Sequence, residues 1–341
     1  MESPTLADWV GDVRSFTGHQ WQRKPAVFTP ERLASPFDLD ALDAAFDTGL
    51  LRTPYLEMVR STKVTVPPEA YTTSRTVNGT AYHGFADRAK VLALLGVGAT
   101  LLLRCVDQWH RPTGELVARL SEELDRRVEA FFFVTPAGGQ GLAVHRDDAD
   151  VFVLQAAGHK TWYVHDAPTA ADWTPGELPD DEHSPRLLHS VLEPGSVLYV
   201  PRGFAHRAVG AAGLSAHLSL TIRDISVPDL RAALEQRLTD GLDLPARPLG
   251  EAAIDDSCAA LLDHVRTRLD TIEPEDLRLA ARAAQARAAR AEAAAENAER
   301  AETFAEAART WEGGGTGAGR AGLASVSRTW RRLRDAARTT H

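Results

Sequence analysis

The feature that most constrains the fold is a series of short apolar and aromatic runs between residues 130 and 222. The runs cover residues 130–134, 151–155, 160–165, 197–200 and 214–222. Each is shorter than a typical helix and rich in residues that favour pleated strands. Gly158, Pro194-Gly195 and Pro201-Arg202-Gly203 separate them and supply turns. Short strands joined by turns predict an antiparallel barrel or jelly roll rather than βαβ units.

Helical patterns lie on both sides of these strands. Apolar residues recur at helical spacing in residues 39–46, 115–128, 227–238 and 252–269. Pro274 opens a run of Ala, Glu and Arg that ends near Trp311, and alanine is the best helix former. No convincing strand follows Ile225. The sequence therefore predicts an α+β fold with a jelly-roll core between helical regions.

The chain is long enough for a catalytic domain and accessory parts, because 341 residues exceed the usual size of one domain. Composition and pattern give four divisions. We expect an N-terminal helical or mixed region at 1–125 that supports the core, a strand-rich core at 126–226, a helical region at 227–311, and a Gly- and Arg-rich flexible tail at 312–341.

Charge and cysteine content exclude several classes of protein. The net charge of −9 argues against direct DNA or RNA binding as the main role, since that needs dense positive charge. It is compatible with a basic peptide or protein partner. Cys105 and Cys258 are the only cysteines, too few for a disulfide framework or a thiolate zinc site. The absence of a secretory signal and of a long apolar stretch predicts a cytoplasmic protein with no membrane association.

Three residues suggest a metal site. His145 and Asp147 are two apart, so on an extended segment their side chains point to the same side. His206 follows a strand and a Pro-Gly turn, which could bring it back to the first pair across a jelly roll. Two histidines and one carboxylate form the facial triad of non-haem Fe(II) oxygenases. This triad leaves three coordination positions open, two for a bidentate 2-oxo acid and one for O2.

An H-x-D pattern alone is common, and a lone strand histidine more often has a structural role. The surrounding motifs are more specific. They closely resemble those of the JmjC-type ribosomal oxygenases, cupin-like protein hydroxylases that act on ribosomal proteins. The resemblance covers about residues 14–225 and rests on Phe16, Trp21, Lys24, Pro25, residues 135–142, His145–Asp148, 151–155, Gly158, Lys160, Trp162, residues 192–203 with His206, and residues 215–219.

The resemblance implies a double-stranded β-helix of the JmjC type with Fe(II), the cosubstrate 2-oxoglutarate, and O2. It implies that His145, Asp147 and His206 bind the metal and are the catalytic residues. Lys160 would pair with the distal carboxylate of 2-oxoglutarate. An inward-facing strand lysine would otherwise be a costly unpaired charge, and the alternative is an exposed lysine. Ser219 would place its hydroxyl against the same carboxylate, the alternative being a hydrogen bond to a strand carbonyl.

Other aromatic and histidine residues have less defined roles. Trp162 and Phe152 are expected in the core and pocket wall, and His217 is either a support of the site or structural. Surface or loop positions are expected for His159, His165, His183 and His189.

Two departures from the family pattern bear on function. Family members carry a polar or tyrosyl side chain on the strand before Thr135, where this chain has Phe131-Phe132-Phe133. The 2-oxoglutarate pocket is therefore expected to be rearranged or weaker. The family also ends in a helical dimerisation region and a winged helix. The helices after residue 227 fit the dimerisation region and predict a homodimer. The Ala-rich run and Gly-rich tail do not resemble a winged helix.

The function implied is hydroxylation of a side-chain carbon, the β-carbon of a histidyl or arginyl residue, in a ribosomal protein. One alternative is a tailoring hydroxylase of a ribosomally made peptide natural product, and another is a histone-demethylase-like activity. A non-catalytic cupin binding module and a structural dimerisation protein are the non-enzymatic alternatives. Iron-dependent conversion of 2-oxoglutarate to succinate would separate the enzymes from these.

Overall fold

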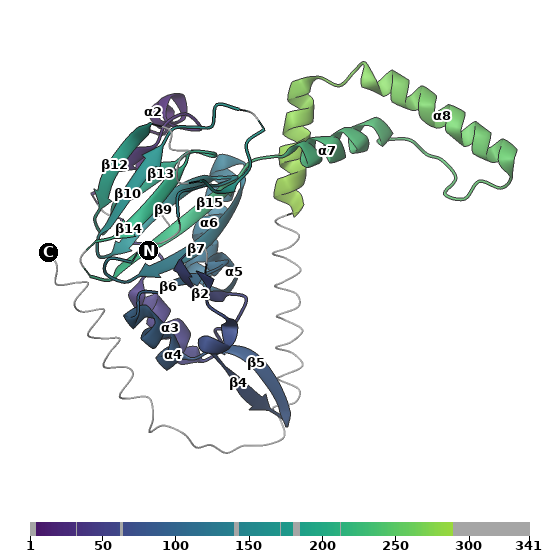
Figure 1. Cartoon of the computed structure of the whole chain (residues 1–341). Helices are drawn as coiled ribbons and strands as arrows, with labels where there is room; N and C mark the ends of the chain where they lie inside the picture. The colour runs from purple at the N-terminus through teal and green to yellow at the C-terminus, as the bar shows by residue number, and fades with distance from the viewer. Residues whose placement is uncertain are drawn as a thin grey trace. The chain divides into compact units, whose positions relative to one another are not determined.

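The computed structural model describes residues 5–288 except 32, 62–63, 140–142, 171, 180–184 and 212. The chain divides into two compact units (Figure 1). Among the described residues, the first contains those up to Glu123 together with Val128–Arg223, and the second contains Leu124–Arg127 and residues 224–288. The predictions for residues 289–341, including most of the Ala-rich helix and the tail, lie outside the described residues.

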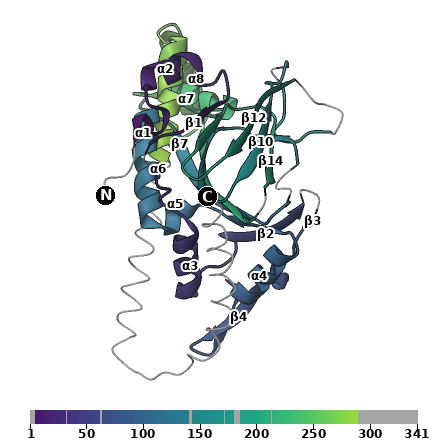
Figure 2. The ribbon, with the colours of Figure 1, turned by 90° about the vertical axis from the view of Figure 1, so that its left-hand side faces the viewer.

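Two antiparallel sheets form the centre of the first unit (Figures 1 and 2). The larger sheet has the order β1 (Ala26–Phe28), β13 (Val197–Val200), β9 (Asp150–Ala157), β15 (Ser215–Arg223), β7 (Arg127–Thr135), β6 (Thr100–Leu103), β2 (Leu56–Ser61), β3 (Val64–Thr65). The smaller has the order β11 (Gly176–Glu177), β8 (His145–Arg146), β14 (His206–Gly210), β10 (Lys160–His165), β12 (Arg186–Leu192). The predicted α+β jelly roll is confirmed.

The expected strands are all present, and 160–165 and 197–200 agree to the residue with β10 and β13. The segment 1–125 does more than support the core, because β1, β2, β3 and β6 belong to the large sheet itself. The sequence predicted none of the strands that precede residue 127. It also did not predict β8 and β11, which have two residues each, or β12 and β14, which mix polar with apolar residues.

The core between the sheets is a cluster of buried side chains contributed by both. It contains Val151, Val153, Trp162, Val164, Leu192, Leu198, Val200, Phe204 and Ala208. Side chains on β10 alternate between the two faces of the sheet. Lys160, Trp162 and Val164 are therefore buried, while the residues between them are partly exposed.

The outer face of the large sheet is covered by aromatic residues of the N-terminal helices α1 (Leu6–Val10) and α2 (Val13–His19). Trp9 and Phe16 lie with their ring centroids 5.4 and 5.7 Å from that of Phe152. Tyr199 joins this group and donates a hydrogen bond of 2.5 Å to Asp150. Phe152 therefore belongs to the core, as expected.

The remaining helices of the first unit are α3 (Leu39–Thr48), the 3-10 turn η1 (Pro68–Ala70), α4 (Arg88–Gly96), α5 (Val106–Trp109) and α6 (Arg111–Leu124). The helix predicted at 115–128 begins and ends four residues earlier, because β7 starts at Arg127. The hairpin of β4 (Thr72–Val77) and β5 (Thr80–Ala86) extends from this unit away from the smaller sheet (Figures 1 and 2).

The second unit is helical. It contains α7 (Val227–Thr239), α8 (Glu251–Leu269) and a helix that starts at residue 274 and continues to 288, the last described residue. Ser226 begins α7 through a capping box with Asp229. The structure records no strand between residues 224 and 288. Across the described parts of the chain, no helix combines the length and apolarity that a membrane span requires.

Candidate metal centre

The three predicted metal ligands meet at one end of the small sheet. His145 lies on β8, Asp147 follows it, and His206 is the first residue of β14. The two strands pair with His145 opposite His206, which places the imidazole ring centroids 4.3 Å apart. Backbone pairing thus brings together two residues that are far apart in the sequence.

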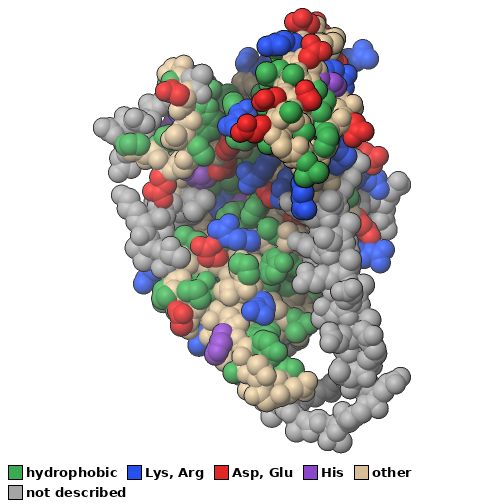
Figure 3. Space-filling model, turned by 90° about the vertical axis from the view of Figure 1, so that its right-hand side faces the viewer, with side chains coloured by type: hydrophobic (Ala, Val, Ile, Leu, Met, Phe, Trp, Pro, Cys, Tyr) green, Lys and Arg blue, Asp and Glu red, His purple; other side chains and the backbone are tan. Residues whose placement is uncertain are grey.

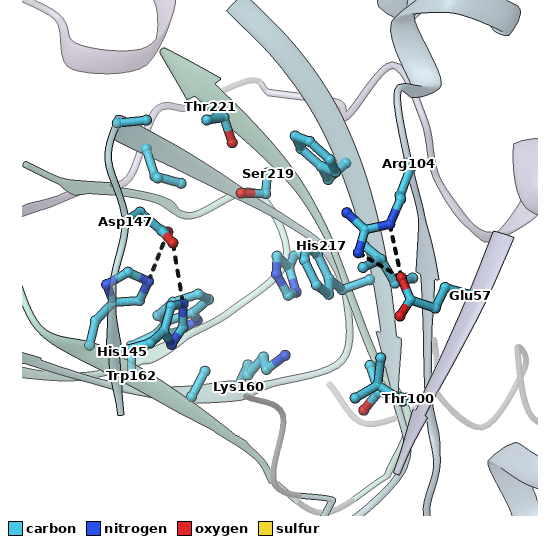
Figure 4. Close-up of a pocket in the computed structure, with 18 of the residues that line it drawn as sticks. Glu57, Thr100, Arg104, His145, Asp147, Lys160, Trp162, His217, Ser219 and Thr221 are labelled. Atoms are coloured by element: carbon cyan, nitrogen blue, oxygen red, sulfur yellow. Dashed lines mark hydrogen bonds and ion pairs between the residues drawn. The ribbon is translucent and has the colours of Figure 1, made fainter. Parts of the chain in front are cut away.

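The ring nitrogens are oriented toward a common point. The Nδ1 atom of each imidazole lies within hydrogen-bond distance of a backbone carbonyl, at 2.8 Å from Ala143 and 3.0 Å from Phe204. These contacts favour the proton on Nδ1 and leave the Nε2 lone pair free to bind a metal. The Nε2 atoms of His145 and His206 lie 3.7 and 3.5 Å from the two carboxylate oxygens of Asp147 (Figure 4).

This arrangement fits a metal ion. Separations of 3.5 and 3.7 Å are too long for good hydrogen bonds and leave space for a cation between the three groups. One ligand atom from each residue lies within 4.8 Å of the others, and it is the one such group of three found among the described residues. Burial and the neighbouring His145 lower the pKa of His206 to about 4, so its imidazole is the neutral form that metals bind.

Four contacts hold the segment around Asp147, three of them to the turn before His206. The backbone N–H of Gly203 donates to the Asp147 carbonyl at 3.0 Å. The buried Arg146 guanidinium donates to the carbonyls of Gly203 and Asp166 at 2.5 and 3.0 Å. Arg202 also pairs with Asp148, with Nε 2.6 Å from the carboxylate. These contacts therefore position Asp147 beside His206.

A cavity of about 390 Å³ extends from the triad between the two sheets. Figure 4 shows Asp147 at one end and the Glu57–Arg104 ion pair at the other. The large sheet contributes alternate residues of its strands, and the small sheet contributes Lys160, Trp162 and Ala208. The lining from the large sheet includes Val59, Thr100, Leu102, Phe131, Phe133, Val151, His217, Ser219, Thr221 and Arg223.

Lys160 lies in the wall of this cavity and is 2% exposed. Its Nζ donates to the Thr135 hydroxyl at 3.1 Å, and this hydroxyl also accepts a hydrogen bond of 3.4 Å from Thr100. The structure records no carboxylate paired with Lys160 in the described part of the chain. Burial lowers its pKa to about 7, which shows how poorly the site solvates the charge without an anion.

Ser219 and His217 line the cavity from β15. Residues two apart on a strand face the same side, and both are buried. His217 stacks on Phe133 with ring centroids 4.9 Å apart and an interplanar angle of 4°. Burial, and then the positive charge of Lys160, keep its pKa well below the usual value.

The phenylalanines of β7 divide between two environments. Phe131 and Phe133 line the cavity, while Phe132 is fully buried and packs against Phe37 with ring centroids 4.8 Å apart. The two rings therefore present an apolar surface to the cavity. Thr135, two residues beyond Phe133 on the same face, supplies a hydroxyl beside Lys160.

Sequence reasoning missed part of the site. The cavity is also lined by residues of β6 and β2 or their ends, namely Thr100, Leu102, Arg104 and Glu57. Thr135 accepts a hydrogen bond from Lys160. The alternation of Phe131, Phe133 and Thr135 along one strand could have predicted that Thr135 lies at the site. The pairing of β2 with β6 joins residues more than forty positions apart, from Leu56 with Leu103 to Val59 with Thr100. No local sequence pattern predicts such a pairing.

Other histidines lie outside the cavity lining. His189 on β12 stacks against Tyr163 with ring centroids 4.7 Å apart. His159 and His165 do not line the cavity, and His183 lies outside the described residues.

Comparisons with known proteins agree with the geometry. A JmjC domain model matches residues 108–230. Ribosomal oxygenase 1 of Bos taurus is 32% identical over 189 residues, which are 52% of this chain and 28% of that protein. The bifunctional lysine-specific demethylase and histidyl-hydroxylase NO66 of Drosophila grimshawi is 41% identical over 96 residues, 27% of this chain and 13% of that protein. The chain thus spans less than a third of either relative.

A solved structure supports the fold. The X-ray structure of E. coli ycfD aligns with a TM-score of 0.51 and 20% identity, covering 81% of this chain and 71% of that one. At this identity the likeness concerns the fold alone. Residues 108–230 therefore match a JmjC domain, and part of the chain is similar in sequence to ribosomal oxygenase 1.

Proposed function

We propose that the protein is an Fe(II)- and 2-oxoglutarate-dependent oxygenase that hydroxylates a side-chain carbon of a protein or peptide. The observation that carries this proposal is one cavity with two histidine Nε2 atoms directed at a carboxylate and a buried lysine in its wall. The triad fits a divalent metal, and the lysine fits a dianionic cosubstrate.

His145, Asp147 and His206 would hold the metal on one face and leave the face toward the cavity open. When bound, Fe(II) would supply the activation of O2, with 2-oxoglutarate oxidised to succinate and CO2 and one oxygen atom inserted into a C–H bond of the substrate. The chain itself orients the ligands. The carbonyls of Ala143 and Phe204 hold the imidazole tautomers, which supports metal binding.

Lys160 would bind the distal carboxylate of 2-oxoglutarate. Its pKa is lowered to about 7 by burial, and a bound carboxylate would stabilise the protonated form. The Thr135 hydroxyl occupies one hydrogen-bonding direction of Nζ and holds the ammonium group in place. Ser219, which lines the same cavity, is proposed as a second contact. Trp162, Phe131 and Phe133, which also line the cavity, would exclude water around them.

We propose a ribosomal protein as the substrate, with the β-carbon of a histidyl or arginyl residue as the site of hydroxylation. The names of the relatives support this, one being a ribosomal oxygenase and the other a histidyl-hydroxylase. Such a substrate would place the activity in the cytoplasm. A precursor of a peptide natural product remains the alternative substrate with the same chemistry.

Mass spectrometry of ribosomal proteins tests this function. Total ribosomal protein is incubated with Fe(II), 2-oxoglutarate and either the wild type or His145→Ala. The proposal expects one peptide to gain a single oxygen atom with the wild type only, in proportion to the succinate released. Succinate release without any modified ribosomal peptide would redirect the search to other peptides. No succinate under any condition would favour a non-catalytic binding module.

We further propose that the helical unit mediates homodimerisation. None of the residues of α8 is buried, and Ile254, Leu261, Leu262 and Leu269 are exposed on it. Hydrophobic side chains are interspersed with charged ones on the face drawn in Figure 3. An amphipathic helix whose apolar residues are uncovered favours burial against a second copy.

For the domain organisation we propose a catalytic core at 126–226 and dimerising helices from 227. Strands β2 and β6 complete the large sheet and the cavity. The core therefore should not fold without residues 1–125.

A further inference from the structure

His217 has a buried polar atom without a partner inside the cavity wall. The side chain is 3% exposed, and its Nδ1 has no hydrogen-bond partner among the described residues. The ring is held between Phe133, which it stacks on, and Trp162, which meets it edge-on with centroids 5.5 Å apart. Figure 4 shows it between Asp147 and the Glu57–Arg104 pair, near Lys160.

The protein alone does not explain a polar ring at this position. A buried polar atom without a hydrogen bond costs about 1–3 kcal/mol, and such atoms are rare in native proteins. A phenyl ring would keep both aromatic contacts without this cost. The stacking on Phe133, nearly coplanar at 4°, also fixes the plane in which the ring nitrogens lie. Nδ1 is enclosed by the wall, and an unpaired acceptor costs less than an unpaired N–H, so the proton belongs on Nε2. Because His217 lines the cavity, this Nε2–H is the donor that a ligand there would meet.

We propose that His217 is a binding residue for 2-oxoglutarate and donates a hydrogen bond to its distal carboxylate beside Lys160. The proposal rests on the proposed function. A neutral imidazole carries one N–H donor. Its hydrogen bond to a charged carboxylate is stronger than a hydrogen bond between two uncharged groups. Phe131 and Phe133 offer no polar atom on their wall, so the donor on that side of the cavity would come from His217.

The charges in the cavity suit this role. Lys160 is close enough to His217 to disfavour its protonation, so the imidazole remains a neutral donor while the lysine carries the charge. The distal carboxylate of 2-oxoglutarate would then form an ion pair with Lys160 and accept a hydrogen bond from the uncharged imidazole of His217.

Calorimetric titration of the Mn(II)-loaded full-length protein with 2-oxoglutarate tests the proposal without measuring turnover. His217→Phe keeps the aromatic contacts and removes the donor, and His217→Gln keeps an N–H donor. We expect binding to weaken about 10- to 100-fold in His217→Phe and by less than about 5-fold in His217→Gln. Thr161→Val, beside Lys160 on β10 but outside the cavity lining, is the matched control and should bind as the wild type does.

A second ligand locates the contact. 2-Oxobutyrate has the chelating groups and lacks the distal carboxylate, so wild type and His217→Phe should bind it equally. Equal loss for both ligands would overturn the assignment to the distal carboxylate. Undiminished binding of 2-oxoglutarate by His217→Phe would overturn the proposal altogether. If that variant does not fold, His217→Met provides a second side chain without a donor.

The outcomes also separate this inference from the proposed function. A folded, Mn(II)-loaded wild type that binds no 2-oxoglutarate contradicts both. A wild type that binds it, with Lys160→Met impaired and His217→Phe unimpaired, contradicts only the role of His217.

Discussion

Replacing Lys160 by methionine should stabilise the ligand-free protein and remove its affinity for 2-oxoglutarate. Lys160 is 2% exposed, and its one recorded hydrogen bond is to the Thr135 hydroxyl. Methionine has a similar volume and no charge to desolvate. The substitution therefore removes the cost of burying an ammonium group while keeping most of the packing.

The magnitude follows from the pKa of the lysine. A fall from 10.5 to about 7 corresponds to a cost of roughly 5 kcal/mol in folding free energy, at about 1.36 kcal/mol for each pKa unit. Between these two values the unfolded chain binds this proton more tightly than the folded protein does. The free energy of unfolding of the wild type therefore rises with pH in this window, by roughly 2 kcal/mol from pH 7 to pH 9 for this group.

Urea unfolding at pH 7 and pH 9 measures this. Lys160→Met should be more stable than the wild type at pH 7, and the difference should shrink by roughly 2 kcal/mol at pH 9. Lys24→Met, a change of an exposed lysine, is the matched control and should keep the pH dependence of the wild type. A Lys160→Met protein with the same pH dependence as the wild type, or with lower stability at pH 7, would refute the reasoning.

The ligand provides the second part of the prediction. With Mn(II) present and 2-oxoglutarate at about 100 times its dissociation constant, the wild type should gain about 2.7 kcal/mol. Lys160→Met should gain almost nothing at the same concentration. A full gain in the variant would mean that the carboxylate is held elsewhere.

Three further results are expected. Arg146→Met, which removes the hydrogen bonds to the carbonyls of Gly203 and Asp166, should weaken metal binding about 10- to 100-fold in a competitive chelator titration; unchanged affinity would show that the triad does not depend on this contact. Phe152→Ala, at a fully buried position, should lower the free energy of unfolding by about 3–5 kcal/mol in urea, and a loss below about 1 kcal/mol would contradict the packing described. Leu262→Glu on α8 should convert a dimer into a monomer in sedimentation velocity with 2-oxoglutarate binding intact, whereas a wild type that is already monomeric would remove the basis for the dimer.

Strands β10 and β13 were located to the residue because turn residues flank both and their side chains favour strands. Strands β8 and β14, which carry two of the candidate ligands, were not predicted, since the first has two residues and the second begins with His206-Arg207. The candidate ligands were nevertheless proposed from the sequence, because the spacing of His145 and Asp147 and the surrounding motifs do not depend on strand length.

The wall of the cavity was less predictable than the triad. Side-chain alternation on β7 accounts for Phe131 and Phe133 in the cavity and Phe132 in the core. The contributions of β2 and β6 depend on long-range pairing, which no local pattern encodes. The role left open for His217 could be addressed only once its stacking on Phe133 and its unpaired Nδ1 were known.

The most direct test of the central claim is an anaerobic titration of metal-free protein with Fe(II) and 2-oxoglutarate, followed by visible absorption. Chelation of the iron by the 2-oxo acid gives a metal-to-ligand charge-transfer band. The account predicts this band in the wild type, its absence in His145→Ala, and a far higher 2-oxoglutarate requirement in Lys160→Ala. A well-folded wild type that shows no band at any 2-oxoglutarate concentration would contradict it.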